Sequence, residues 1–151
     1  MTANWPQERG AHYRAAASAS SSTHVDGSNS ASRRKRLILV VEDHSLIRMG
    51  AVDLVRHAGF DALEAGDADE AIRIMETRND ISLVFTDVEM PGIFDGVKLA
   101  HYVRHRWPPV MLIVVSGADL VAENHLPEGA AFFQKPYNDN AIVQAMIGML
   151  A

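Results

Sequence analysis

Four apolar segments of this sequence each end in residues whose side chains can do chemistry. In chain order these residues are Glu42-Asp43, Asp87, Ser116-Gly117 and Lys135-Pro136. Carboxylates held close together repel one another, so such a site favours a hard cation with oxygen ligands, and Mg²⁺ fits because it binds one or two carboxylates and keeps several waters. A lysine adds a point charge for a phosphate, and a serine hydroxyl and a glycine amide can donate hydrogen bonds to phosphate oxygens. Together these groups could stabilise phosphoryl transfer to a carboxylate.

The apolar segments that carry these residues have the pattern of strands alternating with helices. Leu37–Val41 is a continuous apolar run, typical of a strand buried on both faces of a parallel sheet. The alternation predicts an α/β fold with a doubly wound, five-stranded parallel sheet, in which ligands bind at the carboxyl ends of the strands. The other strands are expected at Asp61–Glu64, Ile81–Thr86, Val110–Val115 and Ala131–Phe133, and helices at Ser45–Ala58, after Asp67, at Val97–Trp107 and at Asn138–Leu150. Leu120–Leu126 has room for about two turns before Pro127, which predicts a short or irregular fourth helix.

Each of these polar residues also has an ordinary structural explanation. A single acid after a strand is usually a cap or turn residue, and a single Lys-Pro pair is usually part of a loop. Four strand ends with chemically complementary groups are far more specific than any one of them. We therefore base the functional hypothesis on the set.

The set of motifs resembles the response-regulator receiver family of two-component systems, which has a flavodoxin-like fold. The resemblance covers Leu37 to about Leu150. It is carried by Glu42-Asp43, by the segment from Thr86 to Gly92 (TDVEMPG), by Ser116-Gly117 and by Lys135-Pro136-Tyr137.

The resemblance implies a role for each matching residue. Asp87, which precedes x-x-Met-Pro, would be the phosphoacceptor. Mg²⁺ would be held by Glu42, Asp43, Asp87 and the backbone carbonyl of Glu89. Ser116, Gly117 and Lys135 would contact the phosphoryl group, and the peptide bond before Pro136 is expected to be cis. The receiver itself would catalyse only its own phosphorylation and dephosphorylation.

Three features depart from the family pattern. The loop from Pro91 to Gly96 is one residue longer than usual. The aromatic switch residue, which would act with Ser116, is Phe132 and has no hydroxyl. The reduced fourth helix places the usual output surface in doubt, and we expect a single-domain receiver without an output domain.

Composition and charge restrict the remaining possibilities. There is no cysteine, no apolar run long enough to span a membrane and no apolar N-terminal stretch of a secretory signal, which favours a cytoplasmic protein without membrane contact. Residues 1–36 contain six basic and two acidic residues, a net charge of +4, and are predicted to be a disordered tail that ends in the basic run 33–36. Residues 37–151, the expected receiver domain, contain 8 basic and 17 acidic residues, a net charge of −9, which argues against direct binding of nucleic acid.

Three functional hypotheses remain open from the sequence. In the first, the chain takes a phosphoryl group from a histidine kinase or a phosphotransfer protein and then changes its binding to a downstream protein, and a homodimer is left open. In the second, it is a phosphatase similar to the haloacid-dehalogenase group, which also uses an aspartate nucleophile with magnesium. In the third, it is a pseudo-receiver that binds a partner without ever being phosphorylated.

Overall fold

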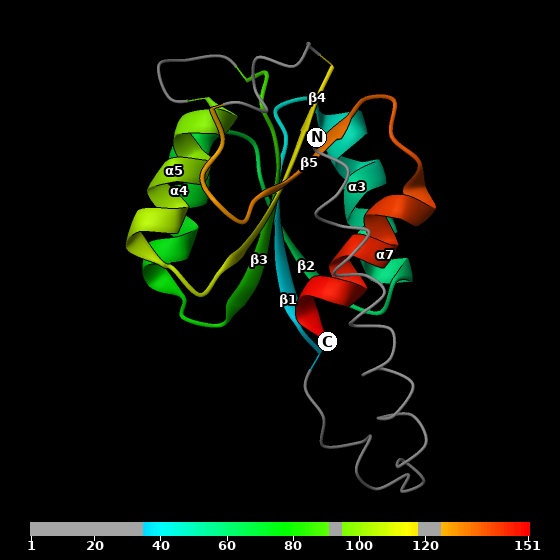
Figure 1. Ribbon diagram of the computed structural model, residues 1–151, viewed down its shortest axis with the longest axis horizontal. Helices are drawn as coiled ribbons and strands as arrows, with labels where there is room; N and C mark the ends of the chain where they lie inside the picture. Colours follow the sequence, from blue (N-terminus) through cyan, green and yellow to red (C-terminus); the bar gives the residue numbers. More distant parts are fainter. Residues whose placement is uncertain (1–34, 91–94, 118–124) are drawn as a thin grey trace, which may run out of the picture.

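The fold is a five-stranded parallel sheet between two layers of helices (Figure 1). The computed structural model describes residues 35–90, 95–117 and 125–151. The strand order is β2-β1-β3-β4-β5. From β1 the chain first adds β2 on one side and then β3, β4 and β5 on the other, so the strand order reverses between β1 and β3. This confirms the predicted doubly wound α/β architecture. The strands are β1 (Leu37–Val41), β2 (Asp61–Ala65), β3 (Ile81–Asp87), β4 (Met111–Ser116) and β5 (Ala131–Gln134).

Four helices in the described part of the chain cover the two faces of the sheet. Figure 1 shows α3 and α7 on one side and α4 and α5 on the other. Their bounds are Ser45–His57 for α3, Ala68–Thr77 for α4, Gly96–Arg106 for α5 and Asp139–Leu150 for α7. These bounds lie close to those that the sequence predicted. Within the described part of the chain, no helix is long and apolar enough to cross a membrane.

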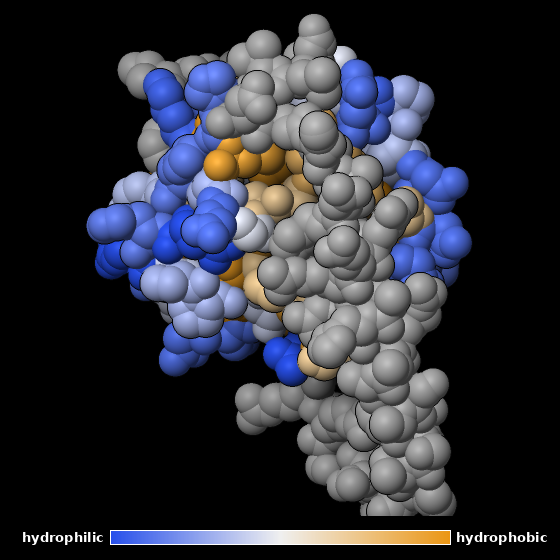
Figure 2. Space-filling model, viewed as in Figure 1, coloured by the Kyte–Doolittle hydropathy of each residue, from blue (hydrophilic) through white to orange (hydrophobic). Residues whose placement is uncertain are grey.

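The core consists of two apolar clusters, one on each face of the sheet. Successive side chains of a strand point to opposite faces, so Leu39 belongs to the cluster under α4 and α5, whereas Ile38 and Val40 belong to the cluster under α3 and α7. Both faces are covered, which is why every residue of β1 is buried and why its sequence is apolar throughout. Figure 2 shows hydrophilic residues over the outer surface of the helices and hydrophobic residues between the two layers.

Only some of the apolar residues of α3 face the sheet. Leu46 and Met49 lie near helical spacing with Leu54 and Val55 in the sequence, but they are 69% and 58% exposed. The buried residues are Ala51, Val52 and Val55. Leu46 is nine residues from Val55, which at 100° per residue places it on the opposite side of the helix. The segment contains two apolar stripes, and the one with the smaller side chains packs against the sheet.

Side-chain caps fix where α4, α5 and α7 begin. Asp67, after which the sequence predicted a helix, accepts a hydrogen bond from the Glu70 amide at 2.8 Å and so caps α4. Asp95 accepts from the amides of Val97 and Lys98, each at 3.0 Å, and starts α5. Because each helix begins beyond the carboxyl end of the preceding strand, these caps order the sheet edge at which ligands are expected.

Some sequence-based predictions fall outside the described residues. They are the disordered tail over residues 1–34, the lengthened loop at residues 91–94, and most of the short fourth helix, which falls in residues 118–124. These remain predictions.

Candidate functional site

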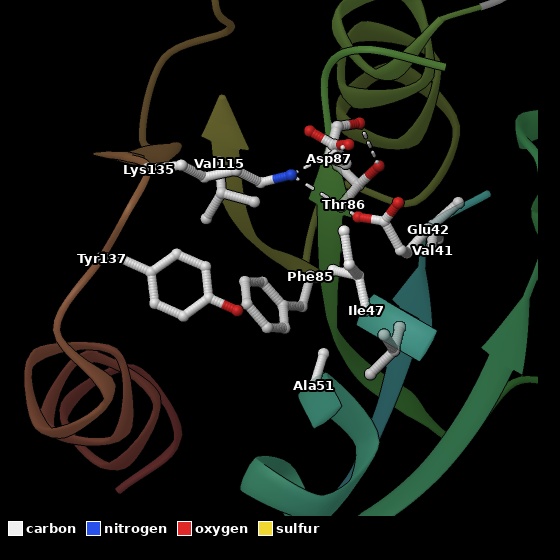
Figure 3. Close-up of a pocket in the computed structure, with 11 residues that line it drawn as sticks. Val41, Glu42, Ile47, Ala51, Phe85, Thr86, Asp87, Val115, Lys135 and Tyr137 are labelled. Carbon is white, nitrogen blue, oxygen red and sulfur yellow. Dashed lines mark hydrogen bonds and ion pairs between the residues drawn. The ribbon is translucent and has the colours of Figure 1, made fainter. Parts of the chain in front are cut away.

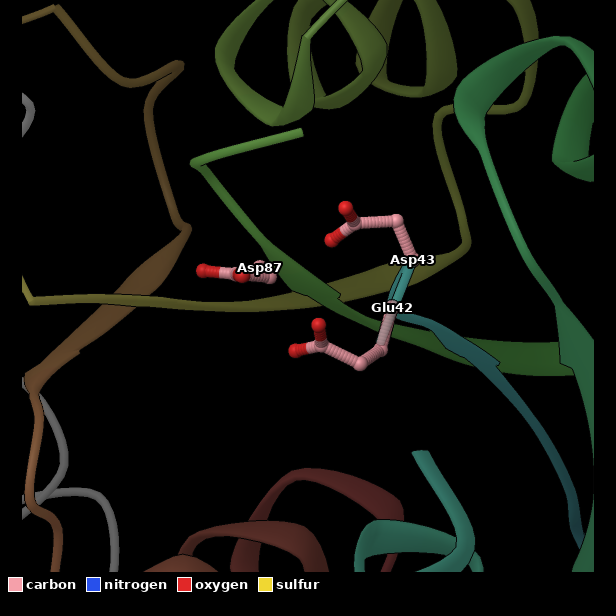
Figure 4. Close-up of side chains that lie close together, drawn as sticks. All are labelled: Glu42, Asp43 and Asp87. Carbon is pink, nitrogen blue, oxygen red and sulfur yellow. The ribbon is translucent and has the colours of Figure 1, made fainter. Parts of the chain in front are cut away.

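Three carboxylates meet at the carboxyl edge of the sheet, beyond the ends of β1 and β3. Glu42 and Asp43 directly follow β1, and Asp87 is the last residue of β3. Each of the three offers an oxygen atom, and these atoms lie within 4.8 Å of one another. Figure 4 shows the three side chains arranged around one small region. Glu42 and Asp87 are 5% and 4% exposed, whereas Asp43 is open to solvent.

Lys135 brings a positive charge into this cluster from the end of β5. Its Nζ lies 3.1 Å from Oδ2 of Asp87 and 3.6 Å from Oε1 of Glu42 (Figure 3). Its backbone amide donates to the Ser116 carbonyl at 2.8 Å, so the strand pairing of β4 and β5 continues to the lysine and fixes its position. The Lys135-Pro136 peptide bond is cis, as expected from the sequence.

Ser116 and Gly117 extend β4 into the same site. The Ser116 side chain is fully buried, and its hydroxyl donates a hydrogen bond to the Glu89 carboxylate. The Gly117 amide donates to the other oxygen of that carboxylate at 3.2 Å. Glu89 was expected to contribute its backbone carbonyl, and its side-chain contact with these two donors is an additional finding.

Burial and mutual repulsion disturb the protonation equilibria of the cluster. Burial raises the pKa of Asp87 above the ordinary value for an aspartate, and the charge of Glu89 adds to this increase, although the ion pair with Lys135 opposes it. Burial also raises the pKa of Glu42, as does the nearby charge of Asp87. Burial by itself would lower the pKa of Lys135, but its attraction to Asp87 and to the other acids raises it. The site therefore contains more negative charge than a single lysine can compensate.

The sequence profile described as the response regulator receiver domain matches residues 38–147. The chain belongs to the receiver domain family of response regulators.

Individual relatives and solved structures agree with this assignment. The chain is 35% identical over 118 residues to the sensor kinase CckA of Brucella abortus, a match that covers 75% of this chain and 12% of that protein. It is 33% identical over 109 residues to the response regulator FleR of Pseudomonas aeruginosa, covering 70% of this chain and 23% of FleR. The chain therefore spans less than a quarter of the length of either relative.

Among solved structures, the receiver domain of the hybrid histidine kinase CckA superposes with a TM-score of 0.64 at 32% identity, covering 76% of this chain and 99% of that one. The response regulator TrrA of Thermotoga maritima, solved with Mg²⁺ and BeF, has the same fold, with a TM-score of 0.67 at 23% identity. It covers 76% of this chain and 99% of that one.

Two residues that the sequence did not point to position the acidic groups of this receiver. Arg48 donates from Nη1 to the Glu42 carbonyl at 2.8 Å and from Nε to the Glu64 carboxylate at 3.0 Å, and so ties the end of β1 to α3 and β2. Gly96 begins α5 against the backbone of Asp87, and a Cβ at this position would lie 2.0 Å from the Asp87 carbonyl oxygen. The Asp95-Gly96 pair was visible in the sequence, but its contact with the Asp87 backbone at the end of β3 was not.

Phe132, the expected switch aromatic, is packed in the core. It is 6% exposed and belongs to the cluster on the α4 and α5 side of the sheet. It pairs in register with Val114 of β4, two residues before Ser116 on the same side of that strand. The receiver thus places Phe132 and the Ser116 side chain on the same face of the sheet, on neighbouring strands.

Proposed function

We propose that this receiver accepts a phosphoryl group on Asp87 from a phosphohistidine of a histidine kinase or a phosphotransfer protein. The observation that carries the proposal is the buried Asp87 carboxylate, which lies 3.1 Å from the Lys135 ammonium and shares its surroundings with two further carboxylates. An aspartate that served only to cap a turn would need neither its own cation nor an acidic cluster. The relatives named as sensor kinase and response regulator support the same assignment.

The reaction needs little from the protein beyond position and charge. The N–P bond of the phosphohistidine breaks while an O–P bond forms to a carboxylate oxygen of Asp87, and the electron pair of the broken bond returns to the imidazole nitrogen. Lys135 holds the carboxylate and is close enough to offset charge on the phosphoryl oxygens. Ser116 and Gly117 present a hydroxyl and an amide at the end of β4, where they can donate to those oxygens.

A divalent cation fits the acidic cluster. Its donor atoms are all oxygens, which is the set that Mg²⁺ prefers. Burial raises the pKa of Glu42 and of Asp87, neighbouring carboxylates add to the increase, and Lys135 opposes it without cancelling it, so a further positive charge would stabilise the ionised cluster. Glu42, Asp43 and Asp87 would hold the ion together with the Glu89 carbonyl. When bound, Mg²⁺ supplies positive charge that neutralises the carboxylates and the phosphoryl oxygens. TrrA, which shares the fold, was solved with Mg²⁺ and BeF.

The size of the cavity beneath these groups bears on the phosphatase hypothesis. The cavity measures about 10 Å³ and is lined on its apolar side by residues such as Ile47, Phe85 and Tyr137 (Figure 3). This is about the volume of one water molecule, whereas pockets for organic ligands measure roughly 300–1,000 Å³. The geometry therefore favours transfer to and from a partner protein over hydrolysis of a small organic phosphate.

The proposal is tested by phosphorylation with acetyl phosphate and Mg²⁺, followed by intact mass. We expect the wild-type protein to gain one phosphoryl group, and Asp87→Asn or chelation of the metal to abolish the gain. Asp53→Asn, which changes an exposed aspartate on α3, is the matched control and should behave as wild type. Equal labelling of the Asp87→Asn variant would disprove the assignment. Continuous release of phosphate at many turnovers per minute would favour the phosphatase hypothesis, and a wild-type protein that is never labelled would favour the pseudo-receiver.

A further inference from the structure

The Glu89 carboxylate already engages both groups that we propose as donors to the phosphoryl oxygens. One of its oxygens accepts the hydrogen bond of the Ser116 hydroxyl, and the other accepts that of the Gly117 amide at 3.2 Å. Its own backbone amide points to Oδ1 of Asp87 at 3.4 Å. An anion with two oxygens, held directly beside the phosphoacceptor, thus takes the contacts that two oxygens of a phosphoryl group would take.

The burial of Ser116 and of Phe132 is consistent with Glu89 occupying the phosphoryl-binding donors. The serine side chain is fully buried and directed to an anion, and Phe132, on the same side of the sheet, is packed in the core at 6% exposure. Ser116 and Phe132 are the two residues that the sequence marked as the expected switch pair. In the structure, Ser116 is already hydrogen-bonded to a carboxylate and Phe132 is already buried.

We propose that the Glu89 carboxylate is an internal competitor of the phosphoryl group, which occupies the Ser116 and Gly117 donors until phosphorylation of Asp87 displaces it. This inference rests on the proposed function of Asp87. It makes the release of Glu89, and not a movement of Ser116, the first structural consequence of phosphorylation.

Electrostatic repulsion favours displacement of the Glu89 carboxylate by the phosphoryl group. A phosphoryl group adds about two negative charges and three acceptor oxygens. The charge of Glu89 already acts on both Asp87 and Lys135, so the two groups are electrostatically close. A second anion at this position would be repelled by Glu89, and it would compete for the same two donors. Removal of the Glu89 carboxylate should therefore favour the phosphorylated state.

The competition predicts a specific coupling between Glu89 and Ser116. In the wild-type protein, the Ser116 hydroxyl exchanges one anionic acceptor for another when a phosphate mimic binds, so its net contribution to affinity is small. In the Glu89→Ala variant the hydroxyl no longer gives up a carboxylate acceptor when the mimic binds, so a larger share of its contribution appears. A Glu89 that acted only through its charge would leave the contribution of Ser116 unchanged.

A double-mutant cycle measures this coupling. The affinity for beryllofluoride with Mg²⁺ is determined for the wild type, Glu89→Ala, Ser116→Ala and the double variant. We expect Glu89→Ala to bind more tightly than wild type. The loss of affinity on Ser116→Ala should be about tenfold larger in the Glu89→Ala background, the factor associated with one charge-assisted hydrogen bond. Glu76→Ala, which removes an exposed carboxylate on α4, is the control and should leave both values unchanged.

A second measurement does not depend on any phosphate mimic. The Gly117 amide donates to Glu89, so its hydrogen exchange in the unliganded protein should become severalfold faster in Glu89→Ala and stay unchanged in Glu76→Ala. Unchanged exchange at Gly117, or equal losses on Ser116→Ala in both backgrounds, would overturn the inference while leaving the phosphoacceptor assignment intact. A wild-type protein that bound no beryllofluoride would overturn the proposed function, and this inference with it.

Discussion

Replacement of Gly96 by alanine is expected to destabilise the protein and to slow phosphorylation of Asp87. An ideal Cβ at this position would lie 2.0 Å from the carbonyl oxygen of Asp87 and 2.7 Å from the Cα of Val88. Both are backbone atoms and cannot rotate away. Ordinary contact begins at 3.4 Å, so the start of α5 and the end of β3 must separate by about 1.4 Å, the difference between the two distances.

The size of the effect follows from two opposing terms. Overpacking of this kind costs about 1–3 kcal/mol. The better helix propensity of alanine offsets at most about 1 kcal/mol. Because the clash is with backbone atoms that cannot rotate away, we take the upper part of the overpacking range, about 2–3 kcal/mol. The net loss is then about 1–2 kcal/mol, which for a domain of this size lowers the melting temperature by roughly 4–8 °C. A displacement of about 1 Å at a reacting group can reduce a rate by up to about 100-fold.

Thermal unfolding and acetyl phosphate labelling check these two effects. Gly50 is the matched control, because it lies inside α3 and a Cβ there would meet nothing within 4 Å. Gly50→Ala should therefore raise the free energy of unfolding by about 0.5–1 kcal/mol. The reasoning is refuted if Gly96→Ala melts at or above the wild-type temperature. A destabilised Gly96→Ala that is labelled at the wild-type rate would show that this contact does not position Asp87.

Two further predictions concern the charge of the site. Mg²⁺ should stabilise the protein by about 2.7 kcal/mol at a concentration 100 times its dissociation constant. Asp43→Asn should remove most of this gain in a thermal shift assay, whereas an equally large shift in that variant would place the ion elsewhere. In metal-free buffer, Asp87→Asn should melt above wild type near neutral pH, because burial raises the pKa of Asp87 and so penalises its charged form. Because the pKa of Asp87 is raised on folding, the protonated side chain contributes stability to the wild type that is complete below the unfolded pKa of about 4 and is lost as the pH rises through the folded pKa. The wild type therefore regains stability on acidification, and the advantage of Asp87→Asn should fade. An advantage that grew on acidification would contradict this sign.

The sequence by itself determined the sheet and the residues at its carboxyl edge. Strands buried on both faces need continuous apolar runs, and the polar residues that end those runs stand out for the same reason. Asp87, Lys135 and the acidic pair could therefore be identified from local pattern. A parallel sheet brings all strand ends to one edge, so their meeting also followed from the fold class.

Tertiary structure alone decided the features that depend on how the elements approach one another. The α3 segment has two apolar stripes, and only packing selects the one with Val52 and Val55. The need for glycine at position 96 arises from the approach of the α5 backbone to that of β3. The contact of Glu89 with Ser116 joins residues 27 positions apart, at a distance set by the pairing of β3 and β4. The local sequence pattern determines whether a segment forms a helix or a strand. Strand register and the approach of the helices determine which side chains of two segments come into contact, and no periodicity in the sequence encodes those contacts.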